Sequence, residues 1–256
     1  METTLENVLE SKIYVRENSA ISFKSPREYL TPFIDNIAKL TDDYRISVSN
    51  VVKNKNEEED TFNTSYGRVL IEALLPRQFD TDAESGDTYG TIGFMFALDL
   101  QKPVIKVFTG RYARACTNLC IFGADRVFSQ ELTGNINKCF DTVKEYIDDA
   151  EKDLIQSIKL ITYMKNEIYS GESLDEFTGN ILRKSLLNPK LGHTPIIQGT
   201  RELYNEKSIY ALSNGETTGW NYYNSITENI KKVDILDRAN KTALVTELFV
   251  PYEIMN

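Results

Sequence analysis

Basic and aromatic side chains alternate within residues 101–126 of this 256-residue chain, and together such groups can bind a nucleic acid. The segment holds five basic residues and one acidic residue, a net charge of +4, in a chain whose formal net charge is −9. Cations contact phosphates, and aromatic rings stack on unpaired bases. We predict a nucleic-acid-binding site, with no catalytic residue and no metal ligand, made of Lys102, Lys106, Phe108, Arg111, Tyr112, Arg114 and Asn118.

These side chains act together only if they lie on one face of a sheet. Alternating apolar residues predict two strands, 102–108 and 112–121, joined as a hairpin around Thr109-Gly110. An odd number of turn residues would bring the basic side chains of both strands to the same face, with the two aromatic rings between them. A two-residue turn would move Arg114 to the other face, because a shift of one residue reverses every side chain. The structural alternative is a solvated sheet face with incidental lysines.

Other residue types that perform catalysis are sparse. The chain has one histidine, His193, and three cysteines. A nucleophilic pair of Cys116 with His193, and a zinc site on Cys116 and Cys120, both lack the additional residues that such sites require. Together with Cys139, these thiols are expected to be reduced core residues. The sequence also lacks a phosphate-binding loop and a dinucleotide-binding glycine motif. We therefore predict a protein that is not an enzyme and needs no cofactor.

Acidic residues gather between residues 54 and 90, nine of them against three basic residues. Within this stretch, Asp80 to Asp87 places carboxylates at alternating positions, as a calcium-binding loop does. Its glycine falls one position late, however, and Thr91 stands where such a loop has a bidentate glutamate. We expect a solvated acidic loop, with a divalent-cation site as the alternative. We also hypothesise that residues 54–90 mask the basic site or discourage the binding of duplex DNA.

Strands dominate the first half of the sequence, and helices dominate the second. Apolar residues at helical spacing predict one long helix, or two with a kink, over residues 136–168. A capping-box pattern at Ser173 predicts the start of the next helix, and Asp234 is expected to separate the two helices of residues 220–248. The remaining predicted elements are a helix from Ser25 to Leu40, strands over 44–52, 68–75 and 88–98, and a loop over 187–195.

This order of elements predicts an α+β fold, with an antiparallel-rich sheet (a β-β-β-α core), a long helix and a helical C-terminal region. We expect a sheet-rich part over residues 1–134 and a helical part over residues 135–256, within one continuous domain. The N-terminus does not resemble a signal peptide. No apolar run approaches the ~18 residues that a membrane-spanning helix needs. We therefore predict a cytoplasmic protein.

Two short motifs give residues 65–250 a resemblance to a known family. Cys116-Thr117-Asn118 ends a predicted strand, and Trp220-Asn221-Tyr222-Tyr223-Asn224-Ser225-Ile226-Thr227-Glu228 lies in a late helix, followed by the tail from Asp237 to Phe249. With these motifs, the chain resembles the phage/plasmid-like proteins of unknown function, domain-of-unknown-function family 932. Leu119 departs from family members that have glycine soon after the asparagine. The resemblance implies an origin on a mobile genetic element, and it transfers no catalytic residue.

A weaker likeness exists at the level of the fold. Several strands followed by a long helix are similar to the single-strand annealing proteins of the Rad52 type, although no motif supports this residue by residue. With the basic segment, the two resemblances predict a phage or plasmid DNA-metabolism protein that binds single-stranded DNA as a homo-oligomer in the host cytoplasm. The alternative is an acidic protein-interaction factor, such as an anti-defence protein or a virion component, with a basic protein as its partner.

The late helical motif has a structural and a functional interpretation. Its aromatic residues, Trp220, Tyr222 and Tyr223, are expected to pack in the core. Its polar residues, Asn221, Asn224 and Glu228, are spaced three and four apart and so share one stripe of the helix. We expect this stripe to be a solvated face, with a surface facing a ligand or partner as the alternative.

Overall fold

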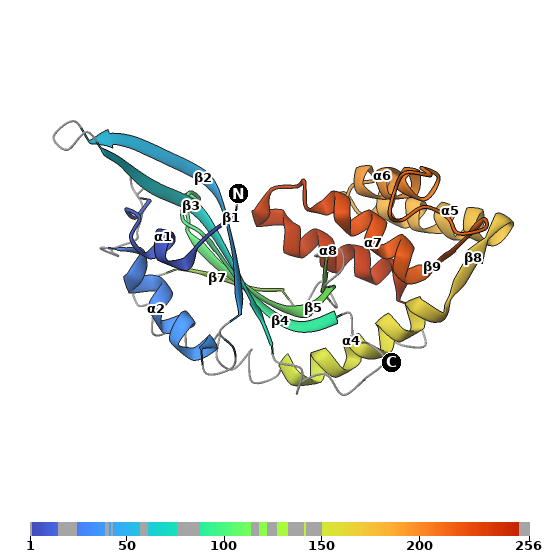
Figure 1. Cartoon of the computed structure of the whole chain (residues 1–256), viewed down its shortest axis with the longest axis horizontal. Helices are drawn as coiled ribbons and strands as arrows, with labels where there is room; N and C mark the ends of the chain where they lie inside the picture. The colour runs from blue at the N-terminus through green and yellow to red at the C-terminus, as the bar shows by residue number, and fades with distance from the viewer. Residues whose placement is uncertain are drawn as a thin grey trace. The chain divides into compact units, whose positions relative to one another are not determined.

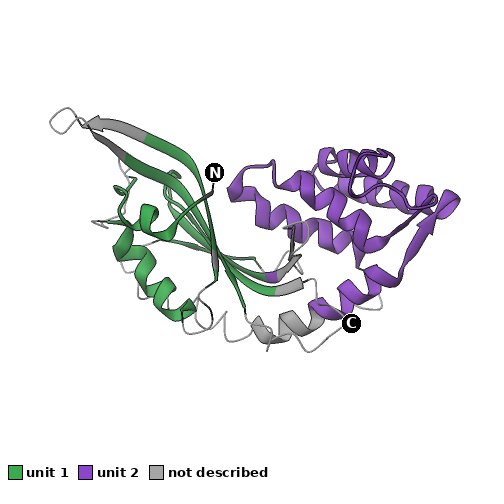
Figure 2. Cartoon of the chain, viewed as in Figure 1, with its two compact units in different colours: residues 1–79, 90–109, 127–151 green, residues 80–89, 110–126, 152–256 purple. Residues whose placement is uncertain are grey.

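The structure is a computed structural model of the chain, and it describes residues 2–14, 25–38, 41, 43–56, 61–75, 88–113, 118–121, 127–132, 141 and 150–250 (Figure 1). It confirms the predicted α+β class, because an antiparallel sheet is followed by a helical C-terminal region. The chain forms two compact units, which Figure 2 distinguishes by colour. We call them the sheet unit (Met1–Phe79, Gly90–Thr109 and Val127–Glu151) and the helical unit (Asp80–Tyr89, Gly110–Arg126 and Lys152–Asn256).

The main sheet has the strand order β1-β2-β3-β4-β5-β6, and β7 pairs with β5. Every pairing whose register is described is antiparallel. Three predicted strands, over 44–52, 68–75 and 88–98, are confirmed as β2, β3 and β4, although β2 and β3 are longer than predicted. The strands are β1 (Glu2–Thr3), β2 (Tyr44–Asn56), β3 (Thr61–Leu74), β4 (Thr88–Ala97), β5 (Val104–Ala113), β6 (Asn118–Ile121) and β7 (Val127–Glu131).

One face of the sheet is mainly apolar, whereas the other combines polar and charged side chains with buried apolar ones. Ile46 lies opposite Ile71, and Ile71 lies opposite Phe94, so these buried side chains share the apolar face. The residues next to them in each strand point the other way, because successive side chains of a strand alternate. On β5, Phe108 belongs to this second face, because its ring occupies the space that a side chain at position 93 would need. We call this the polar face: Arg45, Ser47, Ser49, Arg68, Leu70, Glu72, Gly93, Met95, Lys106 and Phe108.

Helix α2 (Pro26–Ile37) covers the apolar face. Ser25 is its N-cap and a proline opens it, as predicted, but the helix ends three residues before Leu40. The rings of Tyr29 and Phe33 both lie 5.3 Å from the ring of Phe96, measured between centroids. Burying each such aromatic side chain contributes about 1.5–3 kcal/mol, and burial also raises the pKa of Tyr29 above its usual range. The short helix α1 (Leu5–Leu9) lies beside α2 (Figure 1). Helix α2 therefore closes this face of the sheet.

The helical unit contains five helices and a small two-stranded ladder among its described residues. Of the helix predicted over 136–168, α4 confirms the later part and ends at Asn166, while residues 133–140 and 142–149 lie outside the described residues. Ile168 instead begins a strand. The elements are α4 (Ala150–Asn166), β8 (Ile168–Ser170), α5 (Gly171–Leu187), α6 (Thr194–Leu203), β9 (Glu216–Thr218), α7 (Gly219–Ile230) and α8 (Ile235–Phe249).

The predicted start of α5 at Ser173 is wrong by a few residues. The N-cap is Ser170, whose backbone N–H donates a hydrogen bond to Ser173 Oγ at 3.0 Å, so Ser173 takes the third helical position of the capping box. Both serines suit the pattern, and pairing with Glu216 decides between them, because it keeps the chain extended as far as Ser170. The predicted break near Asp234 is confirmed, since that residue is the N-cap of α8. Helix α6 was not predicted.

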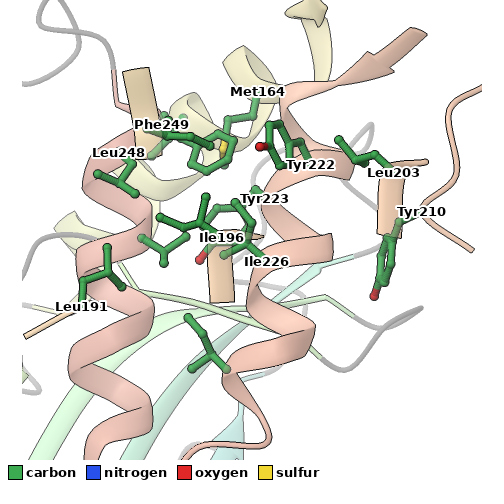
Figure 3. Close-up of a cluster of buried hydrophobic side chains, with 14 of the residues drawn as sticks. Met164, Leu191, Ile196, Leu203, Tyr210, Tyr222, Tyr223, Ile226, Leu248 and Phe249 are labelled. Carbon is green, nitrogen blue, oxygen red and sulfur yellow. The ribbon is translucent and has the colours of Figure 1, made fainter. Parts of the chain in front are cut away.

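Helix α7 lies at the centre of the helical core, which Figure 3 shows in close-up. Tyr222, Tyr223 and Ile226 are fully buried and contact side chains from the neighbouring helices. Helix α6 approaches α7 closely at Gly199, where an added Cβ would lie 2.7 Å from the Cα of Ile226. A glycine at this position is therefore required by the packing of two helix backbones.

Candidate nucleic-acid interface

The predicted hairpin around Thr109-Gly110 is wrong, because β5 runs through these two residues without a turn. The first half of β5 pairs with β7, and the second half pairs with β6. Gly110 lies opposite Ile121, and Thr109 lies between this pair and the pair Phe108–Val127, so pairing on both sides keeps the two residues extended. Residues 114–117, which join β5 to β6, lie outside the described residues.

The continuous strand rearranges the predicted site residues. The backbone register places residues 106, 108 and 112 on one side of β5 and residue 111 on the other. Residue 118 lies opposite Ala113, on the same side as residue 111. Arg114 lies outside the described residues. The structure therefore keeps Lys106 in register with Tyr112, as an odd turn would have done, and separates both from Arg111.

Phe108 is buried and does not form a stacking surface for bases. Its side chain is 1% exposed, and its ring lies directly over Gly93 of the neighbouring strand. An added Cβ on Gly93 would lie only 1.9 Å from the ring. The sequence pattern placed Phe108 on the correct face but could not show that a glycine across the strands makes room for its ring.

The two lysines near Phe108 differ in their surroundings. Lys102 lies just before β5, is exposed, and has its Nζ 3.7 Å from Glu131 Oε2. An exposed ion pair at this distance contributes at most about 1 kcal/mol. Lys106 is half-buried on the polar face, opposite Ser129 of β7. Of the two, Lys106 lies within the sheet and is the less exposed.

Two further cations, Arg45 and Arg68, lie on the polar face and were not among the predicted site residues. Arg45 is half-buried on β2 directly opposite Glu72, a carboxylate that is only 8% exposed. Arg68 is on β3 opposite Ser49, whose buried hydroxyl has no hydrogen-bond partner within the part of the chain that the structure describes. The alternation of residues 44–52 already places Arg45 among polar side chains, whereas Arg68 joins them only through the β2–β3 register.

Arg68 is held in place by a polar network at the end of β4. Its Nε donates to both carboxylate oxygens of Asp99, each at 2.9 Å. Asp99 also accepts a hydrogen bond from the side-chain amide of Asn50, a residue in the left-handed region with φ of 53°. Gly67 allows this approach, since an added Cβ would lie 3.0 Å from the Cβ atoms of both Asn50 and Asp99. The network thus joins β2, β3 and the segment after β4, and it fixes the guanidinium of Arg68.

The aromatic residues of the late motif pack in the core of the helical unit, as predicted. Tyr222 and Tyr223 are fully buried, and Trp220 stacks on Tyr223 with ring centroids 5.6 Å apart. The hydroxyl of Tyr222 lies 2.7 Å from Thr200 Oγ1 and donates to Thr178 Oγ1 at 3.2 Å. These contacts explain the aromatic part of the motif by packing alone.

The polar stripe of the motif is not a solvated face, so that expectation is wrong. The side-chain amide of Asn221 donates to the Tyr210 carbonyl at 2.9 Å and to Thr217 Oγ1 at 3.0 Å. Asn224 is 4% exposed and donates to the Trp220 carbonyl. Glu228 Oε2 accepts from the Tyr210 hydroxyl at 3.3 Å and from Lys231 Nζ at 2.6 Å. These groups stabilise α7 and the loop before it.

The remaining candidates give no second site. His193 is exposed at the N-cap of α6, and Cys120 is in β6, while Cys116, Cys139 and the acidic residues 80–87 lie outside the described residues. No group of three potential metal ligands occurs among the residues that the structure describes. Within the same residues, none of the helices is both long and apolar enough to cross a membrane.

Comparison of the chain with family models, with curated proteins and with solved structures gave no match.

Proposed function

We propose that this protein binds single-stranded DNA on the polar face of the sheet unit, as a non-catalytic protein of phage or plasmid DNA metabolism. The observation behind the proposal is the difference between the two faces. Helix α2 covers one face, and the other bears the half-buried cations Arg45, Arg68 and Lys106 on three different strands, around a centre of buried Leu70, Met95 and Phe108. Cations spread over a sheet can contact the successive phosphates of a single DNA strand that lies across the sheet. The resemblance of the two motifs to phage and plasmid proteins supports the biological setting.

Two features of the polar face favour a phosphate ligand. Because Asp99 fixes the guanidinium of Arg68, little side-chain entropy remains to be lost when a ligand binds. The buried hydroxyl of Ser49 has no hydrogen-bond partner among the described residues, and a phosphate oxygen could accept its hydrogen bond. Both groups occupy the same β2–β3 position, since Ser49 lies opposite Arg68.

Binding of this kind depends on the sugar-phosphate backbone more than on base stacking, because the ring of Phe108 is buried. We therefore expect affinity that falls steeply with salt and varies little with base sequence. Lys102, Arg111, Tyr112, Arg114 and Asn118 stay predicted contacts. Single alanine variants of these residues test each contribution.

The proposal is tested by fluorescence anisotropy with a labelled oligonucleotide of about 30 nucleotides, at about 50 and 200 mM salt. The double variant Arg45→Gln/Lys106→Gln should weaken binding about tenfold and reduce the salt dependence. Arg27→Gln is the matched control, because Arg27 is exposed on α2, on the opposite side of the sheet. Wild-type protein that is folded and does not bind at low salt would exclude DNA as the ligand. Equal losses in the double variant and the control would exclude the polar face.

A second candidate is an acidic protein-interaction factor, favoured by the net charge of −9. Such a protein would bind a basic partner and would show no affinity for the oligonucleotide. Titration with a basic polypeptide such as polylysine distinguishes the two functions, provided that both ligands are tested separately at the same salt concentrations. Binding of polylysine with no binding of DNA would favour this candidate.

A further inference from the structure

We propose that a second surface, at one end of the helical unit, binds the phosphate backbone of a nucleic acid. We call it the basic end: Lys190, Lys231, Lys232, Arg238 and Lys241. It belongs to other elements than the polar face, and it depends on the proposed function only for the choice of ligand. Both segments that form it are described throughout, and the argument uses contacts within the helical unit alone.

Two hydrogen bonds bring the residues of the basic end together. Arg238 donates to the Lys231 carbonyl at 2.9 Å, which joins the beginning of α8 to the end of α7. Lys241 Nζ donates to the Leu191 carbonyl at 3.2 Å, which joins α8 to the loop that bears Lys190. Arg238 and Lys241 are three residues apart on α8 and so lie on the same side of that helix. Cations from three chain segments therefore meet at one end of the unit.

The charge of these segments contrasts with the acidic chain as a whole. Residues 177–201 contain four basic residues and no acidic residue. Residues 229–241 contain four basic and two acidic residues, so the two segments have a combined net charge of +6 in a chain of −9. Of the nearby acids, Glu228 pairs with Lys231, Asp234 caps α8, and Asp237 lies in the first turn of α8. The basic end is therefore a local excess of positive charge.

Helix capping explains only part of this arrangement. Cations stabilise the C-terminal ends of helices, and the contact of Arg238 with the carbonyl of Lys231, the C-cap of α7, is of this kind. Lys184, in the last turn of α5, is placed to act in the same way. Lys241 instead contacts the Leu191 carbonyl in the loop between α5 and α6. Lys190, beyond the end of α5, is exposed and makes no ion pair with any described residue. The charge of Lys190 therefore has no structural use in the described part of the chain and is available to a ligand.

The composition of the surface favours a nucleic acid over an acidic protein. Protein interfaces are fixed in register by groups of both signs, whereas a phosphate backbone requires only cations. Residues 177–201 provide only cations, and residues 229–241 provide four cations against two acids. Two exposed leucines near the end of α5, Leu186 at 66% and Leu187 at 80%, add apolar surface that the unpaired bases of a single strand can contact. We therefore expect single-stranded nucleic acid to bind here more tightly than duplex.

The test uses the full chain and the labelled oligonucleotide, with the double variant Lys190→Glu/Lys232→Glu. We expect binding to weaken about tenfold and the salt dependence to decrease. The matched control is Lys159→Glu/Lys207→Glu, because both lysines are exposed elsewhere in the helical unit. The control should bind within about twofold of the wild type, since only the long-range charge has changed. Urea unfolding of each variant shows whether the fold is intact.

Each other outcome overturns the inference in a distinguishable way. If both lysine pairs behave alike while Arg45→Gln/Lys106→Gln weakens binding, the basic end is not a site and the proposed function stands. If the wild type binds no oligonucleotide, both proposals fail. If polyglutamate binds, the oligonucleotide does not, and Lys190→Glu/Lys232→Glu abolishes the binding of polyglutamate, then the basic end binds an acidic protein instead.

Discussion

The polar stripe of α7 and the polar face of the sheet look alike in the sequence, as regularly spaced polar residues, but they differ in the structure. On α7, the side chains of Asn221 and Asn224 donate to carbonyl and hydroxyl groups of their own unit. On the sheet, Arg45, Arg68 and Lys106 come from separate strands and share one face, and their partners lie far away in sequence: Arg68 pairs with Asp99, and Arg45 lies opposite Glu72. The comparison teaches that spacing identifies which residues share a side, whereas only packing shows whether their partners are local or come from distant segments of the chain.

The largest effect on stability is expected at Phe108, a residue of the polar face whose ring is fully buried. Phe108→Ala should destabilise the fold by about 3–5 kcal/mol, as much as Phe33→Ala on the apolar face, because each removes a fully buried ring. Urea unfolding followed by circular dichroism measures both. A loss below about 1 kcal/mol for Phe108→Ala would contradict its burial and would return this ring to the surface, where it could stack on a base.

A smaller loss is expected at the contact between α6 and α7. Gly199→Ala should cost about 1–3 kcal/mol, because the new methyl group would meet the backbone of Ile226. The matched control is Gly179→Ala in α5, where an added Cβ has no atom within 4 Å. That change should stabilise the protein by about 0.5–1 kcal/mol through helix propensity. Equal effects of the two substitutions would show that α7 is not packed as closely as described.

Removing one hydroxyl from α7 should have a still smaller effect. Tyr222→Phe loses the contacts with Thr200 and Thr178 and should cost about 1 kcal/mol at neutral pH. Burial raises the pKa of Tyr222 above its usual value of 10, so the folded protein keeps a proton that the unfolded chain loses. This contribution to stability is complete below pH 10 and decreases as the pH rises through the raised pKa.

The decrease of the unfolding free energy at alkaline pH gives a second measurement of the effect of Tyr222→Phe. Unfolding free energies determined on both sides of pH 10 should decrease less steeply for Tyr222→Phe than for the wild type. Tyr29→Phe should act in the same direction, because burial also raises the pKa of Tyr29. Identical slopes for wild type and both variants would show that neither phenol is protected from solvent.

The smallest effect is expected for the exposed ion pair at the edge of the polar face. Replacing both Lys102 and Glu131 with alanine should change the stability by less than about 0.5 kcal/mol, because the pair is exposed and its atoms lie 3.7 Å apart. A double-mutant cycle isolates the pair energy from other effects of the substitutions. An interaction energy above about 1 kcal/mol would mean that this edge is shielded from water.

Elements with local signals could be predicted from the sequence. A serine and a proline begin α2 as expected, alternation marks β2, and Asp234 separates α7 from α8. The hairpin around Thr109-Gly110 could not be corrected from sequence, because the local preference of glycine for turns is overridden by the pairing of β5 with both β6 and β7. The choice between Ser170 and Ser173 likewise depends on a strand that is distant in the sequence.

The candidate site was only partly predictable for the same reason. Lys106 was found because it belongs to a basic segment, whereas Arg68 joins the polar face through its pairing with Ser49 of another strand. The burial of Phe108 depends on Gly93, and no property of residues 101–126 indicates that glycine. Local composition thus identified the cations of one strand and missed those that tertiary structure adds.

The contact between Gly93 and Phe108 also limits how this protein can evolve. Any side chain at position 93 would occupy the volume of the ring, so a first substitution there is tolerated only if position 108 has already become smaller. Conversely, a small residue at position 108 opens space that a side chain at position 93 can fill. Among descendants of this sequence, the two positions should therefore change together, first to a small residue at 108 and then to a larger one at 93. Such paired replacements would reveal the pairing of β4 with β5 from sequences alone.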